Sequence, residues 1–428
     1  MFAMNGSKWP IVMPVVPDQR WDCHSCTRCC RDLVVELFEA DRRAMDARDW
    51  SARLGAPPYI PFAGKWVLNK RADSACVFLQ EDGRCRLHAE IGPEAKPVVC
   101  RLYPFTLVPS GGRWLAGWRF DCPSIARSRG GPIATHRKEL NKLRGLLPAP
   151  AVATGGEVAL KRNRPAGKRE VDALLDPLNR WLGDEGRSWN DRLVGAACLI
   201  ETLQSANLSA VRDERFVELI EMLAPDLPLA VTRQRTEAPT RRQHALFRQL
   251  AFAHTEHLTL HEYRSLWTRL SRRFGQLGSA RRFRRGVGRV PPLPGADAEV
   301  TFDAVHRVGP ASDDAKAVSD MVGRFVRMRV VSRYQFGPPY YGWPVLDGLR
   351  ALWMSVGILG WLARCFAAGR GAPVLGEPDV VLALALVDGA IGRSPSLGTV
   401  AERLRLDWLA NDSGIERLLH AYRLVDSA

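Results

Sequence analysis

The sequence predicts a mainly α-helical protein in which a small, irregular cysteine-rich module with short strands precedes a larger α-helical domain. Three observations predict this fold. Eight of the ten cysteines lie within the first 122 of 428 residues, in a stretch interrupted by proline and glycine. A segment rich in alanine, glycine, proline and charge follows at residues 146–168. Beyond it, apolar residues recur mostly at helical spacing.

The cysteines begin with the pattern C-x2-C-x2-C-C and continue with four that are more widely spaced. Thiolates this crowded repel one another unless a metal ion or an iron–sulfur core neutralises them. Disulfides would require an oxidising compartment, and the N-terminal residues show no export signal, so we expect a cytoplasmic protein. The predicted metal ligands are Cys23, Cys26, Cys29, Cys30, Cys76, Cys85, Cys100 and Cys122.

Local patterns within the module predict short elements. Residues 34–37 favour a strand that leads into a short helix near residues 39–41. Residues 76–88 resemble a β-hairpin that turns at Asp82–Gly83, with Cys85 opposite Gln80. Residues 96–105 favour an extended segment bounded by prolines. Pro123 follows Cys122, a feature of some cluster loops, because proline fixes the backbone and removes a competing N–H group.

The number of cysteines favours two metal sites. In a regular hairpin, Cys76 would lie four residues along the strand from the residue opposite Cys85, or roughly 13 Å away at about 3.3 Å per residue. Either the hairpin is irregular or these two cysteines serve different sites. Eight ligands divide naturally into two sets of four, but the spacing leaves the partition open. Cys29 and Cys30 are adjacent, so their side chains diverge, and we expect this pair to be split.

The composition of the module favours an iron–sulfur cluster over zinc. Eight cysteines, few histidines and the Cys122–Pro123 sequence are typical of cluster loops. Zinc bound by four cysteines is the close alternative, because thiolates suit both.

We divide the chain into an N-terminal extension (1–20), the cysteine module (21–125), a helix and linker (126–168) and the α-helical domain (169–428). The apolar stretch at 351–363 is too short to cross a bilayer, so we predict a buried core helix and no membrane span. Cys198 and Cys365 fit buried thiols in apolar helices. Helices are predicted near residues 170–183, 189–205, 212–223, 240–273, 313–330, 346–368, 379–388, 396–406 and 413–423.

The net charge of +15 comes mostly from arginine spread along the whole chain. This distribution indicates a compositional bias, so we do not expect a nucleic-acid partner. The arginine cluster at 279–290 lacks a stacking platform and is predicted to be a solvated basic loop.

Two further segments have alternative interpretations. His254, His257 and His261 would share one face of a helix over 240–273. The outer two would lie about 10 Å apart at roughly 1.5 Å per residue, so we predict a polar helix face rather than a metal site.

The aromatic, proline-rich segment 336–344 could line a pocket, and we favour a rigid packing corner. No radical-SAM C-x3-C-x2-C, G-x-S-x-G or H-E-x-x-H pattern is present.

The N-terminal motifs resemble those of the YkgJ-type cysteine-cluster family. The resemblance covers about the first 125 residues, and Lys96 stands where members of that family often have arginine. It implies a zinc- or iron-chelating domain, or one that contains an iron–sulfur cluster. The matching motifs are C-x2-C-x2-C-C, Cys76-Val77-Phe78-Leu79, Cys85-Arg86-Leu87-His88 and the segment K-P-V-V-C-R-L-Y-P-F at residues 96–105.

The module is also similar to that of the flagellin lysine N-methylases, whose N-terminal cysteine spacing is looser. Two functions therefore stay open. In the first, the metal is structural or redox-active and the helical domain binds a protein partner through an exposed patch. In the second, the protein is an S-adenosylmethionine-dependent protein-lysine methylase. An enzyme should have a pocket between the two domains, where Arg101, Tyr103 or Tyr341 would converge.

Overall fold

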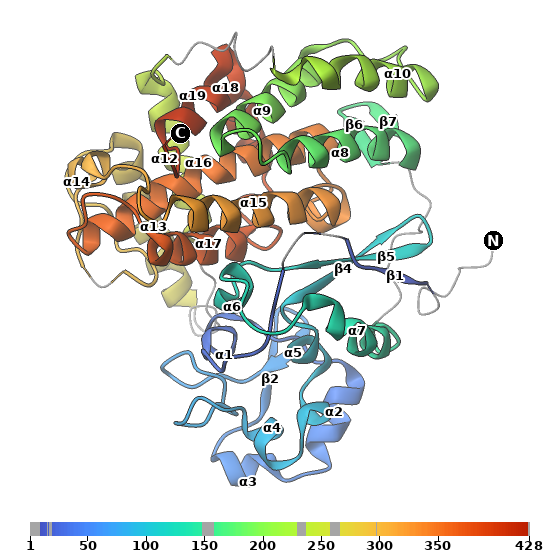
Figure 1. Cartoon of the computed structure of the whole chain (residues 1–428). Coiled ribbons are helices and arrows are strands. Elements are labelled where there is room, and N and C mark those ends of the chain that lie inside the picture. The colour runs from blue at the N-terminus through green and yellow to red at the C-terminus, as the bar shows by residue number, and fades with distance from the viewer. Residues whose placement is uncertain are drawn as a thin grey trace.

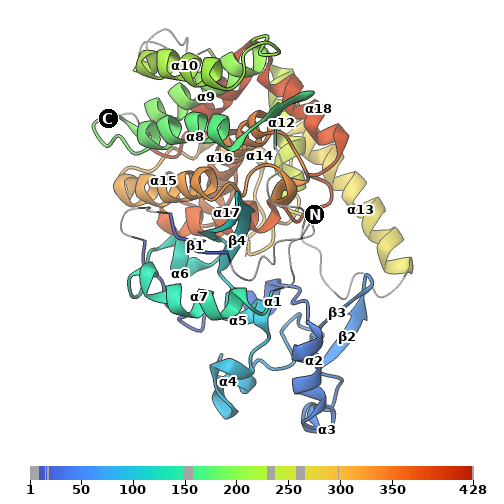
Figure 2. The same ribbon diagram turned by 90° about the vertical axis from the view of Figure 1, so that its right-hand side faces the viewer.

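Figure 1 shows the fold of the chain as a computed structural model. The structure describes residues 9–14, 16, 19–147, 158–228, 237–256, 266–296 and 298–426, with only the backbone for 266–274. The cysteine module forms the lower part of the view and the helical domain forms the upper part. A small sheet lies between them, as a second view confirms (Figure 2).

Short helices and one β-hairpin surround a small core in the lower part of the module. Trp50 and Phe78 fill this core and meet edge to face, with their ring centroids 5.1 Å apart. Asp49 caps one helix by accepting a hydrogen bond from the Ala52 amide, and Gly55 ends that helix with a left-handed backbone. The elements are α1 (Arg28–Asp32), α2 (Glu39–Asp46), α3 (Trp50–Leu54), β2 (Tyr59–Phe62), β3 (Lys65–Leu68), α4 (Arg86–Glu90), η2 (Pro93–Ala95) and α5 (Val98–Leu102).

The sheet between the two parts has the strand order β1-β5-β4, with β1 parallel and β4 antiparallel to β5. Gly111 and Gly112 join β4 to β5, and both have positive φ, as a tight hairpin turn requires. After β5, Phe120 packs on Phe325 of the helical domain, with ring centroids 5.6 Å apart. The sheet thus holds the chain that leads to Cys122 against the helical domain. The elements here are β1 (Ile11–Val12), β4 (Phe105–Ser110), β5 (Arg113–Trp118), α6 (Pro123–Ala126), η3 (Ile133–His136) and α7 (Arg137–Arg144).

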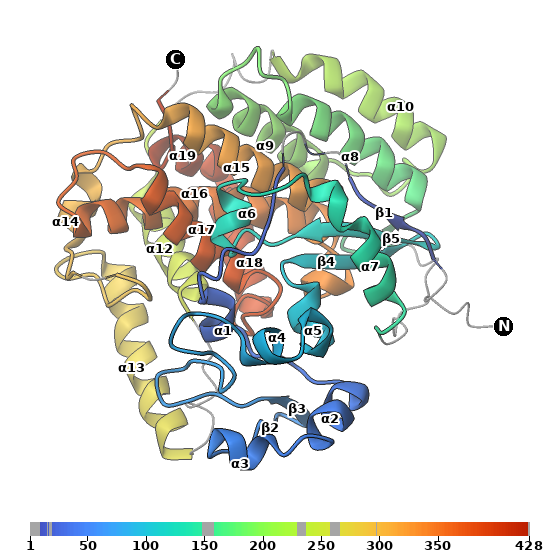
Figure 3. The same ribbon diagram turned by 60° about the horizontal axis from the view of Figure 1, so that its bottom comes forward.

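The helical domain is built around one long buried helix, α16, which is apolar on all sides because other helices surround it. Figure 3 shows α16 near the centre, with α15, α17 and α19 around it. The elements are β6 (Val158–Lys161), β7 (Arg164–Ala166), α8 (Lys168–Leu182), α9 (Trp189–Ser205), α10 (Glu214–Leu223), η4 (Ala224–Asp226), α12 (Arg241–His254), α13 (Leu266–Arg285), α14 (Phe302–Arg307), α15 (Ala315–Val331), η6 (Pro338–Tyr340), α16 (Val345–Gly369), α17 (Glu377–Ala390), α18 (Val400–Ala410), η7 (Asn411–Ser413) and α19 (Gly414–Ala421).

Among the described residues, α16 is the one helix that is long and apolar enough to cross a membrane. The rest of the protein buries 89% of its most apolar stretch. The burial agrees with the predicted core helix.

Most predicted helices are present, and the bounds of α9 are those predicted, but residues 240–273 do not form one helix. α12 ends at His254 and α13 begins at Leu266. His254 is buried, and its Nδ1 lies 2.9 Å from the carbonyl oxygen of Leu250. His257 and His261, the other two residues of the predicted polar face, lie outside the described residues.

The arginine-rich segment 279–290 is not simply a solvated loop, because its first half belongs to α13. Phe283 points inward from this helix and is fully buried, with its ring centroid 6.0 Å from that of Phe302 and 5.6 Å from that of Trp361. Its arginines therefore flank an aromatic anchor of the core.

The segment 336–344 is a packing corner, as predicted. Tyr340 and Trp343 are buried and meet edge to face at 5.3 Å, and the Tyr341 hydroxyl donates to the Ser394 carbonyl at 2.7 Å.

A glycine in α16 allows the chain end to cross it closely. A Cβ at Gly360 would overlap the backbone carbonyl oxygen of Tyr422, whereas a Cβ at Gly357 would meet Phe247 Cε2 at an ordinary 3.4 Å. Overpacking costs about 1–3 kcal/mol, and alanine gains up to about 1 kcal/mol over glycine inside a helix. We therefore expect Gly360→Ala to lower the free energy of unfolding and Gly357→Ala to leave it unchanged or raise it. Urea unfolding checks this; equal effects would contradict the close crossing.

Candidate metal centre

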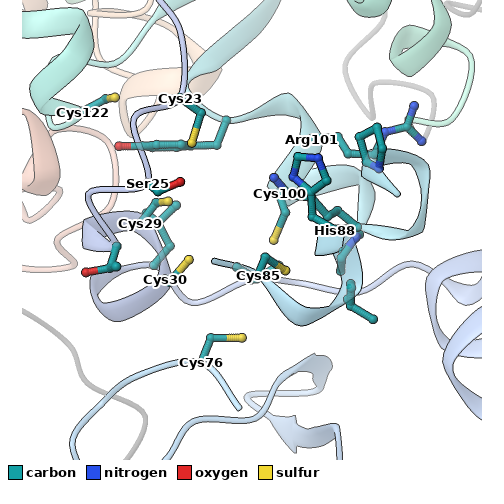
Figure 4. A pocket seen from close by; sticks show the side chains of 18 of the residues that line it. Cys23, Ser25, Cys29, Cys30, Cys76, Cys85, His88, Cys100, Arg101 and Cys122 are labelled. Carbon is teal, nitrogen blue, oxygen red and sulfur yellow. The ribbon is translucent and has the colours of Figure 1, made fainter. Parts of the chain in front are cut away.

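All eight predicted ligands line a single cavity of about 410 Å³ in the module. Figure 4 shows the labelled cysteines arranged around it. The rest of the wall includes aromatic and ionisable side chains, among them Trp21, His88, Arg101 and Tyr103. The structure therefore brings together cysteines that are up to 99 residues apart in the sequence.

The cysteines reach the cavity from short helices, helix starts and turns. Ser25 and Thr27 have left-handed backbones, with φ values of 51° and 63°, so the C-x2-C-x2-C segment curls before α1 begins. Cys23 and Cys26 lie in this curled segment, Cys29 and Cys30 on α1, Cys76 in a turn, Cys85 just before α4, Cys100 on α5 and Cys122 just before α6.

Two predictions about this region are wrong in their details. Cys100 lies on α5, so residues 96–105 are not extended throughout. The hairpin at residues 76–88 is irregular: Cys85 pairs with Leu79 rather than with Gln80, and the Leu79 amide donates to the Cys76 carbonyl at 2.9 Å in a turn. No regular strand therefore separates Cys76 from Cys85, and both face the same cavity.

Burial and local hydrogen bonds have opposite effects on the pKa values of two of the thiols. Burial raises the pKa of Cys76 to about 12 and also raises the pKa of Cys122. The Phe78 amide donates to Cys76, and the Ser124 and Ile125 amides donate to Cys122, which favours the thiolates. Both thiols keep their protons at neutral pH unless a bound cation displaces them.

The adjacent cysteines of α1 differ electrostatically. The hydrogen bond between their side chains lowers the pKa of Cys30 and raises that of Cys29. Positive charges on Lys96, Lys70 and Arg31 lower the pKa of Cys30 further. The cavity therefore combines thiols with nearby cations, which favours bound anionic sulfur.

The spacing of the ligands indicates which kind of group they fit. Within the described part of the chain, no three Cys, His, Asp or Glu side chains converge as a single bound ion requires. A zinc ion needs its sulfurs at about 2.3 Å from one point. The cysteines of an iron–sulfur cluster can lie further apart, because they bind different iron atoms. These thiols surround a cavity, so they fit a group of several metal atoms better than one ion.

A buried carboxylate of the helical domain holds the chain beside this cavity. Asp388 on α17 is fully buried and forms an ion pair with Arg329 of α15. It also accepts hydrogen bonds from the amides of Phe120 at 2.9 Å and Asp121 at 3.3 Å. These two residues directly precede Cys122, so the helical domain fixes the backbone that carries this ligand.

The Asp121 side chain continues this network to the cavity wall. It accepts a hydrogen bond from the Tyr103 hydroxyl at 3.1 Å, and it pairs with Arg119 and with Arg393 of the helical domain. Burial holds the pKa of Tyr103 well above its usual value, so its hydroxyl stays a donor.

A second cavity, of about 920 Å³, lies between the module and the helical domain. Cys26, Thr27 and Lys70 line both cavities, and Arg282 and Phe283 of α13 line the second from the other side. The pocket expected between the domains is therefore present. The residues predicted to converge in this pocket do not line it. Arg101 and Tyr103 line the first cavity, and Tyr341 lines neither.

Sequence reasoning missed the histidines and the carboxylate around the centre. His24 Nδ1 lies 3.1 Å from Ser124 Oγ, and the His136 ring lies 4.7 Å from that of Trp21. Asp388 lies 268 residues from Phe120. No motif marks these positions, because the topology of the whole chain brings them to the cavity.

Searches of curated proteins and of solved structures found no match to this chain. One family does match, over residues 22–123, and its description is "putative zinc- or iron-chelating domain", with the signature CxxCxxCC. The matched residues include all eight cysteines of the cavity and less than half of the chain. The resemblance to the cysteine-cluster family is therefore confirmed for the module, which is a metal-chelating domain.

Proposed function

We propose that the module holds iron–sulfur clusters bound by its eight cysteines, and that the helical domain supports this centre and binds a protein partner. The observation that carries the proposal is the single cavity that all eight thiols line. Such a set of unpaired thiols suits a reducing compartment, so we place the protein in the cytoplasm. The partner is a protein rather than nucleic acid, because the positive charge is spread along the chain.

The arrangement of the thiols supports iron–sulfur over zinc, and two further features suit the thiolate ligands of either group. The thiols surround a cavity instead of a point, as described above. Backbone amides donate to the sulfurs of Cys76 and Cys122, and hydrogen bonds of this kind tune cluster potentials. Lys70 and Lys96 place positive charge beside the cysteines, which stabilises the thiolates that either group requires.

The exposure of the ligands suits a redox role as well as a structural one. Cys23 and Cys26 are exposed, whereas Cys76 and Cys122 are buried. A group held between such ligands has one side open to a partner protein and another shielded from water, and exposure is one determinant of cluster potential.

Metal and sulfide analysis of protein purified without oxygen tests the proposal. We expect iron and acid-labile sulfide in matching amounts, with the visible absorption of a cluster. Removal of the metal with a chelator should lower the melting temperature, because a group that binds only the native state stabilises it. Zinc without sulfide would mean that the module binds structural zinc and no cluster. Free thiols without any metal would refute the metal centre.

A second candidate function is methyl transfer from S-adenosylmethionine to a protein lysine. The 920 Å³ cavity between the module and the helical domain favours it, because an enzyme needs a site of this size. In this reaction the lysine nitrogen forms a bond to the methyl carbon, the sulfonium–carbon bond breaks, and a proton leaves the amine. Calorimetric titration of the anaerobic protein with S-adenosylmethionine tests it; no binding would remove this candidate.

A further inference from the structure

We propose that the cavity holds two metal sites and that the Cys29–Cys30 pair is divided between them. The module-core set consists of Cys30, Cys76, Cys85 and Cys100. The junction set, next to the helical domain, consists of Cys23, Cys26, Cys29 and Cys122. This inference rests on the proposed iron–sulfur binding.

The module-core set is defined by packing. Cys76 belongs to the small core around Trp50 and Phe78, and the other three members pack against that same core. The Cys76 amide also donates to the Cys30 carbonyl at 2.9 Å, which fixes the turn carrying Cys76 to α1. Cys100 lies on α5 and lines the same cavity, and Figure 4 shows its side chain directed toward Cys85.

The junction set is defined by contacts between its two distant segments. Cys122 belongs to the large core that the sheet shares with the helical domain. The segment that carries Cys23 is attached to the chain after Cys122: Gly131 donates to the Asp22 carboxylate at 2.6 Å, and His24 Nδ1 lies 3.1 Å from Ser124 Oγ. Cys26 lies on the same curled segment as Cys23, before α1 begins.

Cys29 lies at the border between the two sets. Successive residues of an α-helix point about 100° apart, so one ion or cluster does not readily bind both Cys29 and Cys30. Figure 4 shows Cys29 on the side of Cys23 and Cys122, and Cys30 on the side of Cys76 and Cys85. Counting four ligands per site then assigns Cys29 to the junction set.

The partition is tested by metal content in alanine variants of the full chain. Cys23→Ala, Cys29→Ala, Cys30→Ala and Cys85→Ala are purified without oxygen and compared with the wild type. Each is expected to keep half of the wild-type metal. The Cys23→Ala/Cys29→Ala double variant should lose no more than either single variant, because both changes disable one site. The Cys29→Ala/Cys30→Ala variant should lose all metal, although it removes only two adjacent ligands.

Unfolding curves of each variant separate loss of metal from loss of fold. A variant that still unfolds in one cooperative transition is folded, even where the loss of metal lowers its melting temperature. Cys365→Ala, a buried thiol far from the cavity in the sequence, is the control and should keep all metal. Equal and complete loss in Cys29→Ala and Cys85→Ala alike would mean one shared site and overturn the partition. Metal-free wild-type protein would instead refute the proposed function itself, so the two failures are distinguishable.

Discussion

Asp388→Ala is expected to destabilise the protein by about 3–5 kcal/mol and to release metal from the junction set. The change leaves the Arg329 guanidinium buried without its carboxylate, and such a loss carries a cost of this size. It also removes the acceptor of the Phe120 and Asp121 amides, which hold the backbone before Cys122. The free energy of unfolding in urea and the metal content of the folded protein measure the two effects separately.

Asp379→Ala is the matched control. Asp379 lies on the same helix, is equally buried and also pairs with an arginine, Arg370. Among the described residues, its side chain bonds to Arg370 and to the Gly376 amide, and not to the chain that leads to Cys122. This variant should lose stability and keep its metal. If Asp388→Ala also keeps all metal below its unfolding transition, Asp388 contributes only to stability and does not position the ligand.

Glu416→Gln is expected to stabilise the protein by about 3 kcal/mol at pH 8 and by little at pH 5. Burial raises the pKa of Glu416 from 4.5 to about 7, and its Oε2 has no hydrogen-bond partner within the described residues. The folded state therefore holds a proton that the unfolded chain has released above pH 4.5. Stability from this group is present at low pH and is lost as the pH rises towards 7, at about 1.4 kcal/mol per pKa unit.

Glu170→Gln should show the opposite sign. Glu170 is as buried as Glu416, but Arg164 and the amides of Gly167 and Asp213 surround its carboxylate and hold its pKa below the usual value despite burial. The ionised form is the stabilising one here, so its replacement should lower stability at pH 8. Urea unfolding of both variants at pH 5 and pH 8 gives the comparison. A Glu416→Gln variant with an unchanged pH dependence would contradict the expected titration.

The helical part of the fold could be predicted because its signals are local. Apolar spacing predicted the bounds of α9. The structure adds the cap at which this helix begins, where Ser188 accepts from the Asp191 amide. The prediction failed at 240–273, where helix-favouring composition continues past the point at which α12 ends. The hairpin β6–β7 was not foreseen, because it lies at the end of the segment that composition marks as a linker.

The eight cysteines could be recognised as metal ligands from their spacing. Their division into two sets of four could not be predicted in this way. Spacing along the chain does not determine which sulfurs meet. That depends on the turn at Cys76, on the helix that carries Cys100, and on the attachment of the segment before Cys23 to Gly131. The role of Asp388 could not be predicted, because no pattern in the sequence near α17 indicates a contact with the module.

The two cavities share a wall, so we expect the occupancy of one to affect the occupancy of the other. Cys26, Thr27 and Lys70 face both spaces, so a molecule bound in the larger cavity touches the loop that carries a ligand of the smaller one. Thermodynamic linkage makes such coupling reciprocal: the factor by which the metal changes the affinity for that molecule is the factor by which the molecule changes the affinity for the metal. The loop that carries Cys26 would then respond both to the concentration of metal and to the concentration of the molecule in the larger cavity.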